Sequence, residues 1–532
     1  CAAEKRRRRK KGAFPDPDRR VFINPDVCEG CGDCGVQSNC VAIVPKETEL
    51  GRKRAIDQSA CNKDFSCLKG FCPSFVTLEG ATPRKQATAE LELPELPDPA
   101  LPEIRGTHNL VITGVGGTGV VTVGAVLAQA AQIDGRGAAM MEMAGLAQKG
   151  GAVHIHCRIA ERPEDITAIR VATGEADALI GGDLVVSAGA KTLGLTAAGR
   201  TGAVVNSHEI MTGAFTRDPE FRLPTERLSL ALERRLKDDL LLLDASEIAR
   251  AVMGDSIFSN MIVFGAAWQR GLVPVSAEAI GEAIRLNGAA VEANLRAFEV
   301  GRWAAHAPGE AARLVAPKVV ELPTSPEEKI AYRERHLRDY GGRRLARRYR
   351  RMLERVEDAE LRAAVAEGYH KLLSYKDEYE VARLLLSSRE KAEAEFDGDF
   401  RMTFHLAPPL LPGKDASGRP KKRAFGEWMV WPLRALRRMR VLRGTPLDPF
   451  GYTAERRMER ALIRQFERDM AELLPKVDDA TRDIVIELAR LPLSIRGFGP
   501  VKQANEAEAA KRREALLAAF RAGGAPVRQA AE

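Results

Sequence analysis

Residues 109–124 read NLVITGVGGTGVVTVG, and the architecture of the middle of the chain can be inferred outward from them. The segment 109–115 is short, apolar and rich in β-branched residues, which predicts a buried strand. Glycines follow it, and an Ala/Val/Leu-rich segment at 120–133 predicts a helix. A strand, a glycine turn and a helix in this order predict a βα unit, from which parallel sheets are built.

Further apolar runs of strand length follow this unit. They lie at Ala138–Met143, Ala152–Ile159, Ala178–Ala188, Gly202–Asn206 and Leu240–Leu243. Residues 276–305 have helical spacing, and we expect them to pack back on the sheet. Strands that alternate with helices predict an α/β domain with a mostly parallel sheet that is covered on both faces.

The glycine turn is also a candidate cofactor site. Its residues satisfy the G-x-G-x-x-G pattern between a strand and a helix, so it predicts a Rossmann-like turn whose helix N-terminus offers backbone amides to a phosphate. An acidic partner is expected about 20 residues later, but Glu142 lies farther along than that. The glycines can equally be required only to pack the helix on the strand. The candidate cofactor-binding residues are Gly114, Gly116, Gly117, Thr118 and Gly119.

A separate segment carries seven of the nine cysteines, between Cys28 and Cys72. Its first three are spaced C-x-x-C-x-x-C with glycines between them, which lets three thiolates converge on one iron–sulfur cluster. Bacterial ferredoxins place the next cysteine three residues on, before a proline. The one Cys-Pro pair in this sequence is Cys72-Pro73. We therefore predict that Cys28, Cys31, Cys34 and Cys72 hold a [4Fe–4S] cluster.

Two alternatives for the cysteines stay open. Cys40, Cys61 and Cys67 remain as candidates for a second cluster, which would need a further ligand. In the other arrangement Cys40 closes the first cluster, and Cys72 joins the remaining two cysteines. Zinc also takes four thiolates, but its ribbons present two separated C-x-x-C knuckles, so the single run of three favours iron and sulfide.

Other features of the composition are less specific. The net charge is +8, and the basic clusters at 5–11 and 343–351 fit solvated surface better than nucleic-acid binding. No apolar run is long enough to span a membrane, and we expect a cytoplasmic protein. In the loop 145–151, Gln148 and Lys149 are candidates to face a phosphate or carboxylate. We expect His154, His156 and Cys157 to be structural residues in a strand.

Composition predicts five regions. These are a basic connector at 1–20, an iron–sulfur segment at 21–82, a proline-rich linker at 83–106, a Rossmann-like domain at 107–310 and a mainly helical domain at 311–532. Within the last region, 400–406 has the pattern of an isolated strand.

The cysteine segment, the glycine turn and the stretch MAGLAQKGGAVHIH at 143–156 together resemble the C-terminal half of fused indolepyruvate ferredoxin oxidoreductases. The Rossmann-like region is similar to the gamma domain of 2-oxoacid:ferredoxin oxidoreductases. The helical region resembles the domain that ends the fused chains. The implied fold is a small ferredoxin-like segment, a gamma domain and a helical domain.

The resemblance also implies a function. In that family, thiamine diphosphate with magnesium attacks a 2-oxoacid, electrons pass through iron–sulfur clusters to ferredoxin, and coenzyme A takes the acyl group. It implies that the cysteines belong to the electron path and that the turn at 114–119 contacts coenzyme A. The thiamine motif of the family does not occur in this sequence, and the opening residues resemble the exit from that domain. We therefore expect an oligomeric enzyme whose thiamine-binding part is a further domain or subunit, and we expect this chain alone to be inactive.

Two other functions compete with this one. The first is a self-contained iron–sulfur reductase that uses NAD(P)H or a flavin at the glycine turn. The second is a nucleic-acid-binding protein with a structural cluster, for which affinity should fall steeply with salt.

Overall fold

The computed structural model describes residues 8–9, 12–84, 91–144, 151–210, 213–218, 220–315, 325–409, 411, 413–415 and 418–524. The chain divides into two compact units. The α/β unit comprises residues 1–15, 57–62 and 84–318. The cysteine unit comprises residues 16–56, 63–83 and 319–532.

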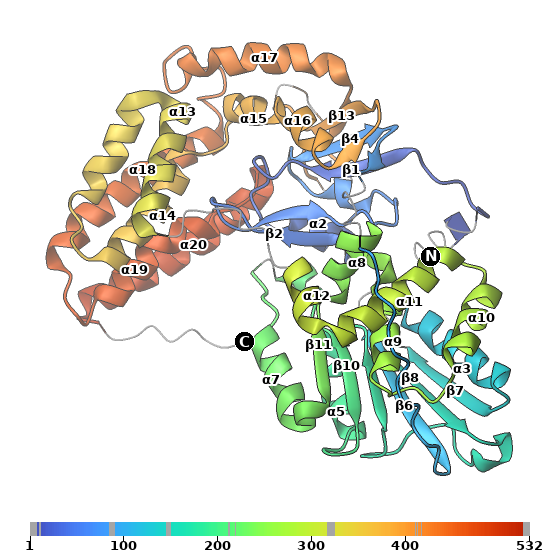
Figure 1. Cartoon of the computed structure of the whole chain (residues 1–532). Helices are drawn as coiled ribbons and strands as arrows, with labels where there is room; N and C mark the ends of the chain where they lie inside the picture. The colour runs from blue at the N-terminus through green and yellow to red at the C-terminus, as the bar shows by residue number, and fades with distance from the viewer. Residues whose placement is uncertain are drawn as a thin grey trace. The chain divides into compact units, whose positions relative to one another are not determined.

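The α/β unit is built on a six-stranded sheet of order β11-β10-β9-β6-β8-β7 (Figure 1). Strands β6, β9, β10 and β11 are mutually parallel, as predicted. The exception in this mostly parallel sheet is β8, which runs antiparallel to both β6 and β7. The connection from β7 to β8, residues 145–151, is too short for the helical crossover that a parallel pair requires. The strands are β6 (Thr107–Val115), β7 (Gly137–Ala144), β8 (Ala152–Ala160), β9 (Ala178–Gly181), β10 (Gly202–Asn206) and β11 (Leu240–Leu243).

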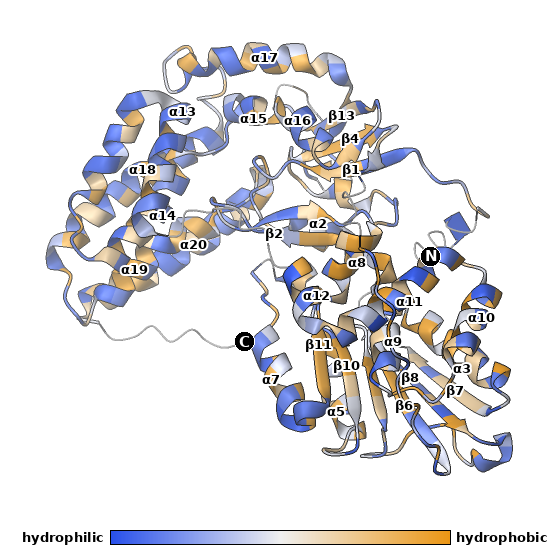
Figure 2. Ribbon diagram, in the orientation of Figure 1, coloured by the Kyte–Doolittle hydropathy of each residue, from blue (hydrophilic) through white to orange (hydrophobic). Residues whose placement is uncertain are grey.

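The centre of this sheet is buried on both faces. Leu110 and Ile112 of β6 pack with α3, α9 and α10 on one face, while Val111 packs with α4 and α7 on the other. Apolar residues therefore dominate the inner strand β10, and Figure 2 shows that the edge strand β11 is apolar as well. The helices are α3 (Val120–Ile133), α4 (Leu184–Ser187), α5 (Ala190–Leu195), α6 (Ala214–Arg217), α7 (Thr225–Leu236), α8 (Ala245–Met253), α9 (Ser259–Gln269), α10 (Ala277–Asn287), α11 (Val291–His306) and α12 (Pro308–Leu314).

Two segments of this unit, 178–188 and 91–104, were predicted from their composition. The apolar run 178–188 is not one strand, because Asp183 interrupts it and caps α4 by accepting a hydrogen bond from the Val186 N–H at 2.9 Å. The described part of the proline-rich stretch, 91–104, forms neither helix nor strand, as expected. Its leucines at 91, 93 and 96 pack against the core of the α/β unit.

The cysteine unit contains an antiparallel sheet of order β1-β4-β13-β14. The prediction of an isolated strand at 400–406 is wrong, because β13 pairs along β4 from Arg401↔Glu79 to Phe404↔Val76. A two-stranded β1/β4 pair alone would be marginal in water, and β13 and β14 extend it. The strands are β1 (Arg19–Ile23), β2 (Ile43–Lys46), β3 (Lys53–Ile56), β4 (Phe75–Glu79), β5 (Thr82–Pro83), β12 (Phe396–Asp397), β13 (Arg401–Leu406) and β14 (Arg423–Phe425).

Most of the rest of the cysteine unit is helical (Figure 1). The longest helix, α13, begins at a capping box of Ser325 and Glu328 and is interrupted at Gly342, whose φ is +81°. None of the helices in the described residues is long and apolar enough to cross a membrane. The helices are α2 (Asp33–Ser38), α13 (Pro326–Leu353), α14 (Ala359–Leu373), α15 (Glu378–Leu385), α16 (Ser388–Glu393), α17 (Val430–Met439), α18 (Ala454–Leu473), α19 (Arg482–Arg490) and α20 (Gly499–Arg521).

Candidate iron–sulfur site

Four of the seven predicted cysteine ligands line one cavity in the cysteine unit, and they are Cys28, Cys31, Cys34 and Cys72. The buried side chain of Arg54 lines the same small cavity. The first three cysteines lie at and just before α2, and the fourth follows the short 3-10 helix Ser66–Lys69. Two segments that are distant in sequence therefore meet at this cavity.

Glycines shape the first of these segments. Gly30 and Gly32 have φ of +70° and +80°, in the left-handed region that glycine adopts without strain. A Cβ on Gly30 would lie 2.2 Å from the carbonyl oxygen of Arg52, so no other residue fits there without a shift of the backbone. The Gly30 N–H points at Cys28 and donates to its Sγ at 3.4 Å. The turn at Gly30 thus directs a backbone N–H toward the sulfur of Cys28.

Asp33 fastens the two segments together. Its carboxylate accepts a hydrogen bond from the Phe71 N–H at 2.6 Å and pairs with the Arg419 guanidinium at 3.0 Å. Gly70 packs directly on Cys34, where a Cβ would lie 2.8 Å from the Cys34 Cα. The relative position of α2 and the segment that carries Cys72 is therefore set by a charged hydrogen bond and by a close backbone contact.

Buried cations surround the cysteines. Burial and the neighbouring Lys376 lower the pKa of Lys53, while Cys28 acts in the opposite direction, and the pKa is about 7. Burial likewise lowers the pKa of Arg54 and of Lys422, against the opposing effect of the cysteines next to each of them. The Lys422 Nζ donates to the carbonyl oxygens of residues 68 and 70, at 3.1 and 2.8 Å. These positive charges would stabilise negative charge in the cavity.

The thiols themselves are hard to ionise without a metal. Burial and the neighbouring Cys72 together raise the pKa of Cys31 to about 12. Burial also raises the pKa of Cys34 and of Cys72. Ser74 places its Oγ 2.9 Å from the Cys72 Sγ. A buried set of four thiolates is therefore costly unless cations balance its charge, which is the role that bound iron and the surrounding lysines and arginine can fill.

These residues fit a four-iron cluster, for which all four ligands are sulfur and the bound group carries net negative charge. Within the described ranges, no three His, Cys, Asp or Glu side chains are grouped closely enough to hold a single metal ion.

The other three cysteines do not line this cavity. Cys40 and Cys67 are buried elsewhere in the cysteine unit, and Cys61 belongs to the α/β unit. A second cluster built from these three thus stays a prediction.

In the α/β unit, the glycine turn joins β6 to α3 as predicted. Its close contacts are with the protein itself: a Cβ on Gly114 would lie 2.6 Å from Val120, and one on Gly119 would lie 2.5 Å from the Asn260 amide nitrogen. Asn260 also donates to the Gly119 carbonyl oxygen at 3.2 Å. At least two of the glycines are therefore required by packing, whether or not the turn also binds a cofactor.

Glu142 does not lie beside the turn as the dinucleotide fingerprint requires. Glu142 of β7 pairs with Ile155 of β8, and Ile155 pairs with Ile112 of β6. Strand β8 therefore lies between Glu142 and β6. Two strand spacings separate Glu142 from β6, about 10 Å. The arrangement does not favour a dinucleotide, which weakens the alternative of a self-contained reductase.

The remaining predicted residues of this unit have structural contacts. His154 places its Nε2 3.2 Å from the Thr192 Oγ1, and the Nδ1 of the fully buried His156 accepts a hydrogen bond from the Val171 N–H at 3.0 Å. Cys157 is fully buried. Gln148 and Lys149 lie outside the described residues.

Comparison with known proteins bears on the α/β unit. Residues 109–304 match the family model "Pyruvate ferredoxin/flavodoxin oxidoreductase". The chain is 29% identical over 195 residues to indolepyruvate oxidoreductase subunit IorB of Archaeoglobus fulgidus, covering 36% of this chain and 92% of that one. It is also 29% identical to the subunit of the same name from Pyrococcus horikoshii, and the match covers 37% of this chain and 96% of that one. Residues 109–304 are therefore similar to the 2-oxoacid ferredoxin oxidoreductase family.

Solved structures and a second family model complete the comparison. The gamma subunit of a keto/oxoacid ferredoxin oxidoreductase from Geobacter sulfurreducens aligns with a TM-score of 0.26 and 22% identity, over 38% of this chain and 99% of that one. Pyruvate oxidoreductase subunit PORC from Thermotoga maritima aligns with a TM-score of 0.27 and 18% identity, over 37% of this chain and 95% of that one. Residues 326–515 match a family of unknown function, DUF6537. Neither matched region includes any of the seven cysteines between Cys28 and Cys72.

The sequence did not reveal several charged residues in or near the cavity. Arg54 lies outside any recognisable motif, and Arg419 and Lys422 come from a basic loop far along the chain. A single signal was available for Asp33, which lies inside the C-x-x-C-x-x-C run itself. The contributions of the two distant cations depend on tertiary structure.

Proposed function

We propose that this chain is the gamma-type and iron–sulfur portion of an indolepyruvate, or aryl-pyruvate, ferredoxin oxidoreductase. Such an enzyme oxidatively decarboxylates a 2-oxoacid to an acyl-CoA and reduces ferredoxin. The main support is the convergence of four cysteines on one cavity, in a chain whose residues 109–304 match the pyruvate ferredoxin/flavodoxin oxidoreductase model. The names of the relatives, which are indolepyruvate oxidoreductase subunits, support the aryl substrate.

In this proposal each part of the chain has a defined task. Cys28, Cys31, Cys34 and Cys72 hold a [4Fe–4S] cluster, and Lys53, Arg54, Lys376 and Lys422 offset its negative charge. A bound cluster supplies one-electron transfer toward ferredoxin. The turn at 114–119 remains a candidate contact for coenzyme A. The thiamine diphosphate and magnesium belong to a separate domain or subunit, with which this chain assembles in the cytoplasm.

Iron and acid-labile sulfide analysis of the anaerobically purified chain, with EPR before and after dithionite, tests the cluster. We expect about four irons and one reduced signal. About eight irons with coupled signals would require Cys40, Cys61 and Cys67 as further ligands. A colourless chain that binds only zinc refutes the proposal.

A second assay tests the substrate. The chain alone is expected to reduce no acceptor, and addition of the thiamine-binding part is expected to give 2-oxoacid-dependent reduction of ferredoxin that requires coenzyme A. Comparison of indolepyruvate with pyruvate then decides selectivity. Faster turnover of pyruvate would contradict the aryl assignment while leaving the reaction class intact.

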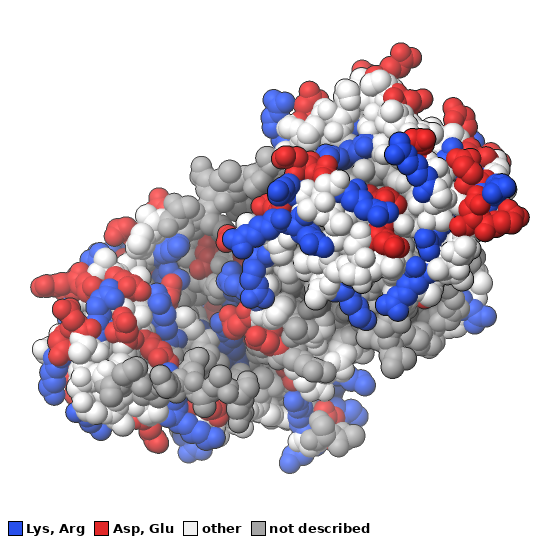
Figure 3. All heavy atoms as spheres, turned by 90° about the horizontal axis from the view of Figure 1, so that it is seen from below, with Lys and Arg blue, Asp and Glu red and all other residues white. Residues whose placement is uncertain are grey.

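The nucleic-acid alternative has less support. On the face drawn in Figure 3, Lys and Arg side chains are interspersed with Asp and Glu and do not form one basic surface. The first basic cluster lies mostly outside the described residues. The second lies on α13 and lines a pocket of limited size.

A further inference from the structure

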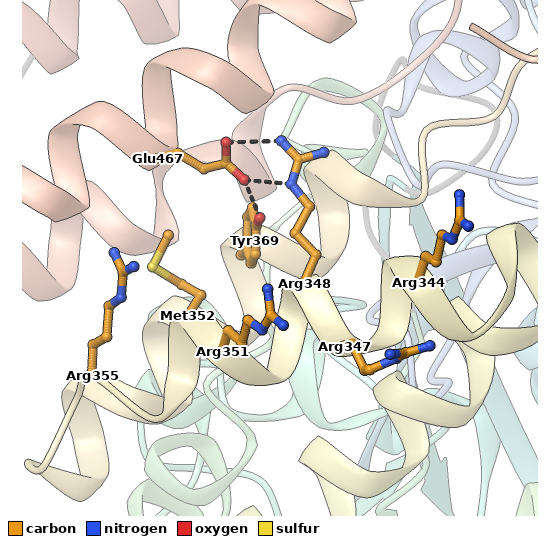
Figure 4. Close-up of a pocket in the computed structure, with 8 residues that line it drawn as sticks. All are labelled: Arg344, Arg347, Arg348, Arg351, Met352, Arg355, Tyr369 and Glu467. Atoms are coloured by element: carbon orange, nitrogen blue, oxygen red, sulfur yellow. Dashed lines mark hydrogen bonds and ion pairs between the residues drawn. The ribbon is translucent and has the colours of Figure 1, made fainter. Parts of the chain in front are cut away.

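An arginine-lined pocket of about 440 Å³ lies in the cysteine unit, among α13, α14 and α18 (Figure 4). Its arginines are Arg344, Arg347, Arg348, Arg351 and Arg355. None of these residues borders the cysteine cavity, and the pocket is formed within the region matched by DUF6537.

The spacing of the arginines explains why they gather on one side. Arg344, Arg348, Arg351 and Arg355 follow one another at intervals of three or four residues, which keeps them on one face of a helix. Arg347 joins them because it precedes Arg351 by four residues. The break at Gly342 starts a new helical segment just before the first of them, and Arg355 follows the helix end at Leu353. The stripe from Arg344 to Arg355 is about 16 Å long at 1.5 Å per residue.

One of the five arginines is already neutralised. Arg348 donates to both carboxylate oxygens of Glu467, at 2.7 and 2.8 Å, and the Tyr369 hydroxyl donates to the same carboxylate (Figure 4). This contact joins α13, α14 and α18 at the floor of the pocket. Burial raises the pKa of the Glu467 carboxyl, but the hydrogen bonds from Arg348 and Tyr369 outweigh this effect and leave its pKa below the usual value.

The other four arginines have no such partner. Within the described part of the chain, the guanidinium groups of Arg344, Arg347, Arg351 and Arg355 make no hydrogen bond or ion pair, and all four are exposed. On another face of the same helix, Arg338 and Arg350 both pair with Glu334. On that other face, two arginines share one carboxylate. At the pocket, four arginines lie close together without one among the described residues, and their mutual repulsion destabilises the helix unless an anion binds between them.

We propose that this pocket binds the phosphate chain of a small oligophosphate molecule, such as a nucleoside di- or triphosphate. Planar guanidinium groups match phosphate oxygens in a two-pronged geometry, and several of them arranged in a row match several linked phosphates. The volume lies within the range of about 300–1,000 Å³ that is usual for small-molecule sites. The ring of Tyr369, the aromatic residue of the pocket, is fully buried, so there is no platform on which bases of a nucleic acid could stack.

Calorimetric titration of the full chain with tripolyphosphate, ADP and ATP at low salt tests this proposal, together with the shift of the melting temperature. We expect binding of one molecule per chain, a rise in melting temperature, and weaker affinity as salt increases. The double variant Arg347→Gln/Arg351→Gln is expected to bind about tenfold or more weakly. Arg338→Gln/Arg350→Gln removes the same charge from the same helix outside the pocket and should bind as the wild type does.

Three results would overturn the proposal. The first is no binding of tripolyphosphate at low salt. The second is an equal loss in the control variant, which would reflect general charge alone. The third is tighter, competing binding of an RNA oligonucleotide or an acidic peptide, which would make the occupant a macromolecule. Circular dichroism checks that each variant folds, and Arg355→Gln, which lies beyond the helix, tests the pocket if the double variant does not fold.

Discussion

Replacement of Gly70 by alanine is expected to prevent the cysteine unit from holding the proposed cluster. The new Cβ would lie 2.8 Å from the Cα and 2.9 Å from the Cβ of Cys34. Ordinary contact begins at 3.4 Å, so the segments must separate by 3.4 − 2.8 = 0.6 Å. Metal sites tolerate deviations of only about 0.2 Å. The backbone at Gly70 has φ of −56°, which any residue adopts, so the effect is steric alone.

The expected loss of unfolding free energy is about 1–3 kcal/mol, which is typical of overpacking against a rigid neighbour. The assay compares iron per chain after anaerobic reconstitution and the urea midpoint of the wild type, of Gly70→Ala and of Gly426→Ala. Gly426 is a matched control in the same unit, because its Cβ would meet only the Trp428 ring at 3.6 Å and its φ is −69°. A Gly70→Ala protein with full iron content and an unchanged midpoint would refute the proposed locking of the two segments.

Three further outcomes are expected. Cys72→Ser should lose the EPR signal and most of the iron, while Cys40→Ser keeps both; the opposite result would assign the fourth ligand to Cys40. Gly119→Ala should destabilise the α/β unit more than Gly117→Ala. Both positions have a positive φ, of +83° and +104°, so backbone strain of about 1–2 kcal/mol is common to the two variants. Urea unfolding should show a further loss for Gly119→Ala, because its Cβ would lie 2.5 Å from Asn260, whereas a Cβ on Gly117 has no neighbour within 4 Å. Burial, with Arg170 and His154 nearby, lowers the pKa of His156 from 6.5 to about 4, so the unfolded chain takes up its proton first as the pH falls. Unfolding free energy should therefore be unaffected by this group above pH 6.5 and should fall by about 3 kcal/mol between pH 6.5 and 4; a stability that stays flat over that interval would show that His156 is not buried in its neutral form.

The sequence was most informative where structure depends on near neighbours. The spacing of Cys28, Cys31 and Cys34 and the βα unit at 109–133 are local patterns, because a two-residue turn or a strand–turn–helix is set by residues close in the chain. The bounds of α3, β10 and β11 followed from the apolar pattern alone for the same reason. Reversal of β8 was missed, since strand direction depends on how the chain between strands returns, not on the strand residues.

Tertiary structure decided the rest. Which cysteine accompanies the first three could only be argued from the Cys-Pro pair, whereas the cavity results from a contact between Asp33 and Phe71 across 38 positions. The pairing of β4 with β13 and the cations of residues 419 and 422 come from more than 300 positions away. The arginine stripe on α13 was visible as a basic cluster, but only packing against Glu467 and Tyr369 distinguished a pocket from a solvated helix face. Local preference sets the elements, while burial and charge pairing between distant segments set which side chains share a site.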